Sequence, residues 1–238
     1  MLLTADHPAV VDALPVHAHR IVDPANANTD KMRVLKSGEH NSKIGGDVLV
    51  GWLKGARIFT LTLPERITCP ASCLHWRSCY GNMDLHASRW LPGPALEARI
   101  RDEVAALCEE HDKVLIRLHY LGDFYSVDYL AMWSDLLDRH LNLYCFGFTA
   151  HEPVSELGSM ICIMRDQMHP KRFWIRHSGH HGEWGSTTLD FPTEKKTFGT
   201  AIVCPEQMDA IEGAERERHC GSCGVCWSTD APVWFVEH

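Results

Sequence analysis

The sequence predicts an α/β protein with a parallel β-sheet. Two features of the chain carry this prediction. Short runs of β-branched and aromatic residues alternate with longer segments whose apolar positions recur at helical spacing. No internal repeat or low-complexity linker interrupts the alternation. Because strands that alternate with helices are joined by right-handed crossovers, they are expected to lie parallel in one sheet.

Length and composition suit one globular core with a small appendage. The chain has 238 residues, of which 45% are hydrophobic and 23% are charged. The formal net charge of -8 argues against a mainly electrostatic grip on nucleic acid, although a local basic groove is compatible with it. No apolar run approaches the roughly 20 residues of a membrane-spanning helix, and no signal-peptide pattern opens the chain. We therefore expect a cytoplasmic protein without a membrane partner.

Three regions are expected along the chain. They are an irregular amino-terminal arm at residues 1–55, an α/β core at 56–203 and a cysteine-rich metal-binding extension at 204–238. The arm has few periodic apolar residues. Its turn-rich basic stretch 41–46 is either a plain surface turn or a loop whose backbone amides hold a phosphate or carboxylate.

The core is expected to begin with the strand 57–63, which is rich in β-branched and aromatic residues. The first helix, 95–111, follows a Pro-Gly-Pro break, and its apolar residues Leu96, Ile100, Val104 and Leu107 recur at helical spacing. The later elements are the strand 113–120, the helix 127–140, the strand 143–150, the helix 153–169 and the strand 171–177. Residues 178–196 are expected to form a loop, followed by a short strand at 200–204, a helix through 207–218 and an apolar segment at 232–236.

Seven of the ten cysteines fall in two tight groups, which favours metal ligation over disulfides. The first group, Cys69, Cys73 and Cys79, lies in the loop that follows the first strand of the core. Three thiolates leave one position of an iron–sulfur cluster open for a substrate or cofactor. A zinc site completed by His75 or His86 is the second possibility, and core or redox thiols are the third. The other three cysteines, Cys108, Cys145 and Cys162, are expected in the core.

A second motif, Gly122-Asp123, follows the strand 113–120 and is expected beside the cysteine loop. Gly122 permits close backbone approach, and Asp123 can accept a hydrogen bond from an ammonium or a ribose hydroxyl. The alternative is a helix entry with Ser126 as the N-cap. Three side chains are the candidate catalytic groups at the predicted rim, and two aromatic residues are candidates for stacking on a cofactor base or for core packing. The catalytic candidates are Asp123, His119 and His151, and the aromatic ones are Tyr80 and Phe124.

The third motif joins a distant Cys-Pro to two successive two-residue gaps. Its cysteines are Cys204, Cys220, Cys223 and Cys226. Four thiolates close a four-iron cluster or a tetrahedral zinc site completely. A second cluster would be an auxiliary redox centre, whereas a zinc ion would brace the fold without chemistry of its own.

The order of strand, three-cysteine loop and strand ending in Gly-Asp resembles the radical S-adenosylmethionine enzymes. This resemblance implies a partial (β/α) barrel, a 4Fe-4S cluster on Cys69, Cys73 and Cys79, and S-adenosylmethionine whose amine lies at Gly122 and Asp123. It further implies an electron donor and a 5′-deoxyadenosyl radical that acts on a small-molecule or nucleotide substrate. The second cysteine gap is five residues here and two in that superfamily.

A closer resemblance, over residues 41–227, is to the phage gene product 88 family. It is carried by Asn41-Ser-Lys43, Thr60-Leu-Thr-Leu-Pro64, Cys79-Tyr80, His119-Tyr-Leu-Gly-Asp-Phe-Tyr-Ser126, Cys204-Pro-Glu-Gln207 and Cys220-Gly-Ser-Cys-Gly-Val-Cys-Trp227. It implies a phage or prophage origin, so that the expected cytoplasm is that of a host cell, and it implies no established reaction. Beside an enzyme, the sequence therefore leaves open a zinc- or cluster-stabilised module that binds nucleic acid or a host protein.

Overall fold

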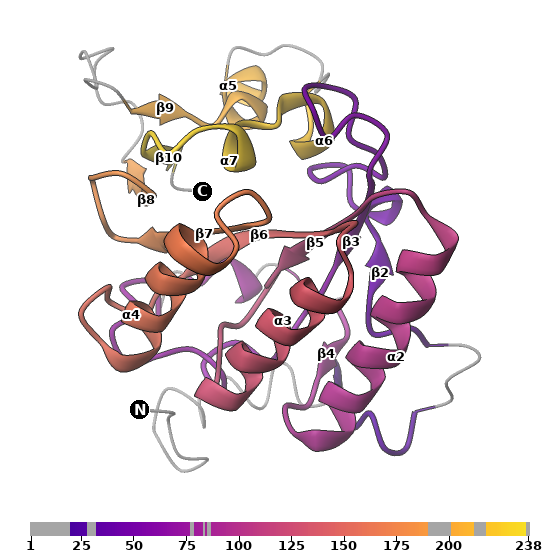
Figure 1. The fold of residues 1–238 in the computed structure, drawn as a ribbon. Coiled ribbons are helices and arrows are strands. Elements are labelled where there is room, and N and C mark those ends of the chain that lie inside the picture. Colours follow the sequence, from indigo (N-terminus) through magenta and orange to yellow (C-terminus); the bar gives the residue numbers. More distant parts are fainter. Residues whose placement is uncertain are drawn as a thin grey trace.

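The computed structural model describes residues 20–27, 32–76, 79–82, 84, 87–189, 201–211 and 218–236. An eight-stranded sheet in the order β2-β3-β5-β6-β7-β8-β10-β9 forms its centre, and every neighbouring pair except β2 and β3 is parallel (Figure 1). The strands are β2 (Lys36–Ser37), β3 (Arg57–Thr60), β5 (Val114–Leu118), β6 (Leu143–Thr149), β7 (Phe173–Ser178), β8 (Gly185–Leu189), β9 (Ile202–Val203) and β10 (Val233–Val236). A small parallel pair joins β1 (Ile21–Val22) to β4 (Arg89–Trp90). The predicted α/β class with a parallel sheet is confirmed.

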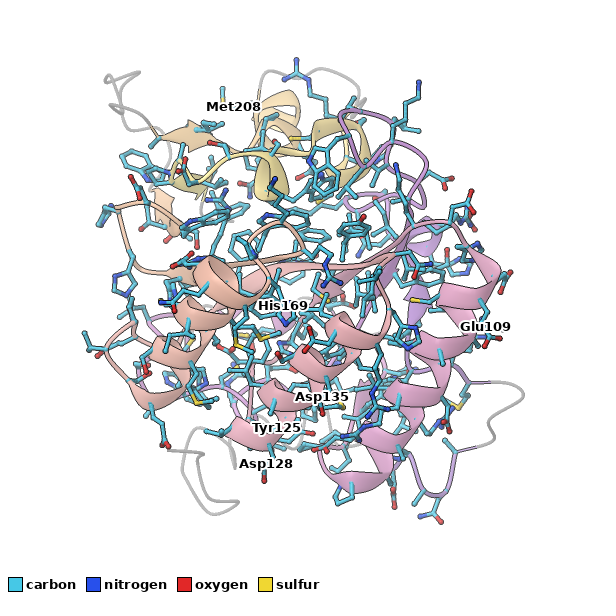
Figure 2. The ribbon with its side chains drawn as sticks, in the orientation of Figure 1. Glu109, Tyr125, Asp128, Asp135, His169 and Met208 are labelled. Atoms are coloured by element: carbon cyan, nitrogen blue, oxygen red, sulfur yellow. The ribbon has the colours of Figure 1, made fainter. Side chains whose placement is uncertain are left out.

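Three helices, α2 (Pro94–Glu110), α3 (Val127–Arg139) and α4 (Glu156–Ile163), cover one face of the sheet (Figure 1). A π-helical segment, Met164–Met168, continues α4. Exposed acidic residues such as Glu109, Asp128 and Asp135 lie on the outer sides of α2 and α3, while His169 is buried with Nε2 2.9 Å from the Ser134 hydroxyl (Figure 2). Two short 3-10 helices occur at Gly38–His40 and Tyr80–Asn82.

The opposite face of the sheet is covered by carboxyl-terminal segments and by the turns before β3. These segments include α5 (Pro205–Ile211), α6 (Cys220–Cys223) and α7 (Val225–Ser228) (Figure 1). Successive side chains of a strand point to opposite faces of the sheet. Phe59 and Ile116 pack under the helices, while Ile58 and Leu115 pack in the cluster that contains Trp227. Strands buried on both sides explain the continuous apolar runs in the sequence.

Most predicted elements lie where the sequence places them, within about three residues. Local signals set the helix boundaries: the Ser126 hydroxyl accepts from the Tyr129 amide to cap α3, and Ser155 caps α4 in the same way through Gly158. Because Ser155 is the cap, α4 begins three residues after the predicted start. The helix expected through 207–218 corresponds to α5, which is described over Pro205–Ile211, and residues 212–217 lie outside the described part.

The loop predicted at 178–196 is wrong in part, because β8 lies within it. β8 pairs in parallel with β7 on one side and with β10 on the other. Its sequence, Gly-Ser-Thr-Thr-Leu, is polar enough to suggest a loop, and partners from distant parts of the chain make it a strand. The cysteine-rich region 204–238 also contributes β10 to the main sheet. None of the helices in the described ranges has the length and apolar character needed to cross a membrane.

Candidate metal-binding sites

The first cysteine loop lies across the carboxyl ends of three parallel strands. It leaves β3, and the Leu63 amide donates to the Leu121 carbonyl after β5 at 3.0 Å. Further along, the Ser72 hydroxyl donates to the Ala150 carbonyl after β6 at 2.8 Å. In α/β folds this edge of the sheet is the usual place for a ligand site.

The loop cysteines, Cys69, Cys73 and Cys79, lie within electrostatic range of one another, and Asp123 acts on Cys69 and Cys73. Burial is the main cause that raises the pKa of all three thiols, and the Asp123 carboxylate is the next cause at Cys69, whose pKa lies well above its ordinary value. Each sulfur also accepts a backbone N–H, which favours the thiolate; the donors are Arg66, His75 and Gly81. Neutral thiols are thus expected without a metal, and amide donors are already in place to stabilise metal-bound thiolates.

Arg66 lies beside Cys73 and Cys79 and carries an unused donor. Its side chain is buried, with Nη2 donating to the Trp76 carbonyl at 2.9 Å and to Asn82 Oδ1 at 2.6 Å. Within the described ranges, its buried Nη1 has no hydrogen-bond partner. Its positive charge favours the thiolate forms of both cysteines. A free guanidinium nitrogen beside thiols suits an anionic group at this position.

A buried ion pair fixes the end of the same loop. The Glu65 carboxylate accepts hydrogen bonds from Arg89 Nε at 2.6 Å and Arg89 Nη2 at 2.7 Å, and both side chains are almost completely buried. Arg89 Nη2 also donates to the carbonyls of Gly81 at 3.1 Å and Asp84 at 3.2 Å. A Cβ on Gly81 would lie 2.3 Å from Glu65 Oε1, so a glycine is needed there. Sequence reasoning missed Glu65, Arg66 and Arg89; the signal was a charged pair directly before the cysteine loop.

Gly122 and Asp123 join the cysteine loop to the end of β6. Gly122 has a φ of +81°, and an added Cβ would lie 2.5 Å from the Thr68 hydroxyl. Asp123 is buried; its carboxylate accepts from the amides of Phe124 and Ala150, each at 2.7 Å, and from the Thr149 hydroxyl at 2.8 Å. Burial raises the pKa of Asp123. Three protein donors make this carboxylate a structural tie between β5 and β6.

The other predicted site residues separate into buried and exposed groups. His119 Nε2 lies 2.9 Å from the Tyr129 hydroxyl, and burial lowers its pKa to about 3. His151 Nε2 donates to the Phe124 carbonyl at 2.8 Å, and the Phe124 ring is fully buried in the core. Tyr80 is 42% exposed, and its hydroxyl lies 2.6 Å from that of Tyr120. Among the aromatic candidates, Tyr80 has a ring accessible to a ligand and Phe124 does not.

A thiol–imidazole pair that the sequence did not reveal lies near this rim. Cys162 Sγ is 3.3 Å from His177 Nε2, and His177 Nδ1 is 2.9 Å from the His151 carbonyl. Because a carbonyl only accepts, Nδ1 carries the proton, and Nε2 of the neutral ring accepts from the thiol. Cys162 was expected as a core residue, and it is half-buried.

The C-terminal cysteines, Cys204, Cys220, Cys223 and Cys226, line one small cavity of about 20 Å³. Cys220 and Cys223 belong to α6, and Gly224, with a φ of +71°, turns the chain into α7. Burial raises the pKa of Cys226 to about 11, and the pKa values of Cys220 and Cys204 are also raised. The amides of Glu206 and Gln207 favour the Cys204 thiolate. Four sulfurs around one cavity fit a soft metal ion or cluster.

As the side chains stand, no group of three His, Cys, Asp or Glu residues in the described ranges has the spacing to hold one metal ion. Closing either cysteine set around a metal therefore requires the thiols to turn towards it. The chemistry of both donor sets suits such a centre, because each combines buried sulfurs with amide donors.

Comparison with known proteins gives a family. A family model described as "Gene product 88" matches residues 25–229. The chain belongs to the gene product 88 family. The Gene 88 proteins of Mycobacterium phages L5 and D29 are each 26% identical to it, over 131 and 134 residues respectively. In both cases the match covers 51% of this chain and 54% of the relative, so the chain spans about half the length of these curated relatives. No solved structure gives a significant match.

Proposed function

We propose that this gene product 88 protein is an iron–sulfur enzyme whose open cluster is held by the loop cysteines. The observation that carries the proposal is that Cys69, Cys73 and Cys79 share one loop at the carboxyl ends of parallel strands, with Asp123 acting on Cys69 and Cys73. Three thiolates would leave one iron available to a small molecule. S-adenosylmethionine is the proposed cofactor. When bound, the cluster and this cofactor would supply radical chemistry through one-electron cleavage of the cofactor.

The chain's own residues have distinct tasks in this proposal. Arg66 offers its free Nη1 to an anionic group of the cluster or cofactor. Tyr80 presents an accessible ring for stacking on a base. Asp123 holds the rim in shape through its three hydrogen bonds, so it acts on the ligand only through position. The parallel strands β3, β5, β6 and β7, with helices on one face, are proposed as part of a partial barrel.

The remaining parts of the proposal concern the second centre and the partners. The C-terminal cysteines would hold an auxiliary 4Fe-4S cluster or a zinc ion. An electron donor would reduce the open centre, and the substrate would be a small molecule or a nucleotide in the host cytoplasm. Nucleic acid would bind only through a local basic surface, because the net charge is -8.

The test is anaerobic purification followed by iron, sulfide and zinc analysis, and then by a search for 5′-deoxyadenosine after addition of dithionite and S-adenosylmethionine. We expect iron and sulfide in the wild type, cofactor cleavage, and loss of cleavage in Cys69→Ser. Cys108→Ser is the matched control, since Cys108 lies outside both cysteine sets, and it should retain activity. A colourless protein that contains only zinc would refute the proposal.

A second candidate function is a metal-stabilised binding module for nucleic acid or a host protein. It is favoured by one observation: Asp123 is occupied by protein donors and Phe124 is fully buried, so neither side chain is free for a cofactor. This alternative predicts bound zinc, no cofactor cleavage, and an Asp123→Ala variant that loses stability without losing any reaction.

A further inference from the structure

Arg117 is a buried cation whose role is not explained by the fold alone. It lies on β5, and its guanidinium stacks over the rings of Phe148 and Phe146, with centroid distances of 4.4 Å and 5.4 Å. In the part of the chain that the structure describes, its buried Nη1 has no hydrogen-bond partner, and no carboxylate pairs with the guanidinium. Cation–π contacts offset only part of the free-energy cost of burying a charge, so an anion near this guanidinium would stabilise it.

Three C-terminal cysteines and Tyr120 are the acidic groups whose charge acts on Arg117. Burial lowers the pKa of Arg117, whereas negative charges on Cys220, Cys226, Tyr120 and Cys204 would raise it. The Phe146 ring connects the two parts, because Trp227, next to Cys226, stacks edge-on against it at 4.8 Å. The same ring therefore contacts both the guanidinium and Trp227 of α7.

A second buried arginine acts on the same segment. Arg176, on β7, is completely buried and donates through Nε to the Cys226 carbonyl at 3.4 Å and through Nη1 to the Ala231 carbonyl at 2.7 Å. Its Nη2 donates to the Thr229 carbonyl. Arg176 thus fixes the backbone that follows the last cysteine, and it also brings a positive charge to the Cys226 thiol.

We propose that Arg117 is the counter-ion of a metal–tetrathiolate centre on the C-terminal cysteines, with Arg176 supplying the second matching charge. A divalent ion on four thiolates carries a net charge of minus two, as does a four-iron cluster in its oxidised state on four thiolates. The guanidinium groups of Arg117 and Arg176 offset that charge, with Arg176 shared between Cys226 and Asp230, whereas four neutral thiols would leave Arg117 without an anion. The inference rests on the proposed metal centre and adds to it a residue that is not a ligand.

The experiment uses the purified 238-residue chain loaded with zinc. Cysteines are alkylated with iodoacetamide over time and the modification of each is followed by mass spectrometry, because metal-bound thiolates are protected. We expect Arg117→Met to speed alkylation of the C-terminal cysteines and release of their zinc to a chelator by roughly 10- to 100-fold, the usual effect of losing a supporting contact. Arg117→Lys, which keeps the charge, should recover most of the protection. Arg139→Met, at an exposed position of α3, is the control for removal of an arginine.

The outcomes separate this inference from the metal centre itself. If the wild type shows no protected C-terminal cysteines, the proposed centre is absent and the inference falls with it. If the wild type is protected and Arg117→Met is equally protected, the centre stands and the counter-ion role is wrong. A further readout has an unusual sign: after metal removal, Arg117→Met should melt at a higher temperature than the wild type, because it no longer buries an uncompensated charge. A lower melting temperature in that state would indicate a packing role only.

Discussion

Breaking the Glu65–Arg89 pair should destabilise the protein strongly and loosen the cysteine loop. Arg89→Met removes two hydrogen bonds of 2.6 and 2.7 Å to Glu65 and further bonds to the carbonyls of Gly81, Asp84 and Ala87. It also leaves the carboxylate, 5% exposed, without its guanidinium. Truncating one partner of a buried pair costs about 3–5 kcal/mol. In a chain of this size each kcal/mol lowers Tm by roughly 2–4 °C, so we expect a loss of roughly 6–20 °C.

The assay is urea and thermal unfolding followed by circular dichroism, with three comparison variants. The double variant Glu65→Leu/Arg89→Met should recover much of the stability, because no buried charge is then left alone. The exposed pair of Arg57 and Glu39, at 2.8 Å, is the control, and Glu39→Gln should leave the unfolding midpoint almost unchanged. A loss below about 1 kcal/mol for Arg89→Met, or a double variant as unstable as the sum of its two singles, would show that burial of this pair does not govern the loop.

Three further predictions test other parts of the molecule. The pKa of His119 is about 3 in the fold against 6.5 in a free chain, so its contribution to stability is complete above pH 6.5 and is lost as the pH falls towards 3. Between pH 6.5 and 5 the free energy of unfolding in urea should therefore fall by about 2 kcal/mol more in the wild type than in His119→Phe. Parallel pH profiles of the two proteins would contradict this. In the same assay, Gly122→Ala should lower the free energy of unfolding by about 1–3 kcal/mol, because the φ of residue 122 is +81° and the new Cβ would lie 2.5 Å from the Thr68 hydroxyl. An unchanged unfolding midpoint would argue against a strained turn. His177→Gln should slow iodoacetamide alkylation of Cys162 about tenfold at pH 7, because the variant has no imidazole to accept the thiol proton. Equal alkylation rates, followed by mass spectrometry, would show that the 3.3 Å contact between Cys162 Sγ and His177 Nε2 does not activate the sulfur.

The sequence predicts an element of this fold correctly where the signals for that element lie within one continuous segment. The helix α3 has its cap at Ser126, its apolar stripe and its end within one continuous segment, so the sequence alone places it correctly. The strand β8 has none of these features, because its pairing depends on β10, which lies more than forty residues later. A polar segment becomes a strand through partners that a local pattern does not contain.

The candidate sites divide in the same way. Spacing along the chain was enough to group the C-terminal cysteines, and the cavity that they line agrees with that grouping. Spacing could not reveal Arg117, because the aromatic rings that hold it belong to β6 and the thiols near it belong to the carboxyl terminus. For Asp123 the sequence offered a ligand role and a helix entry, and the structure adds a third role, since its hydrogen-bond partners come from the chain after β6.

The turn at 41–46, which the sequence left open between a surface turn and an anion loop, braces the second cysteine set. The carbonyls of Lys43 and Ile44 accept the amides of Cys220 at 2.9 Å and Gly221 at 3.1 Å, so these carbonyls hold the first turn of α6. Lys43 Nζ also lies 3.4 Å from Glu206 and 5.9 Å from the Tyr80 ring centre. Because Tyr80 follows Cys79 directly, one lysine contacts the surroundings of both cysteine sets. The turn therefore contacts both cysteine regions, through the backbone carbonyls that hold α6 and through the Lys43 side chain near Tyr80.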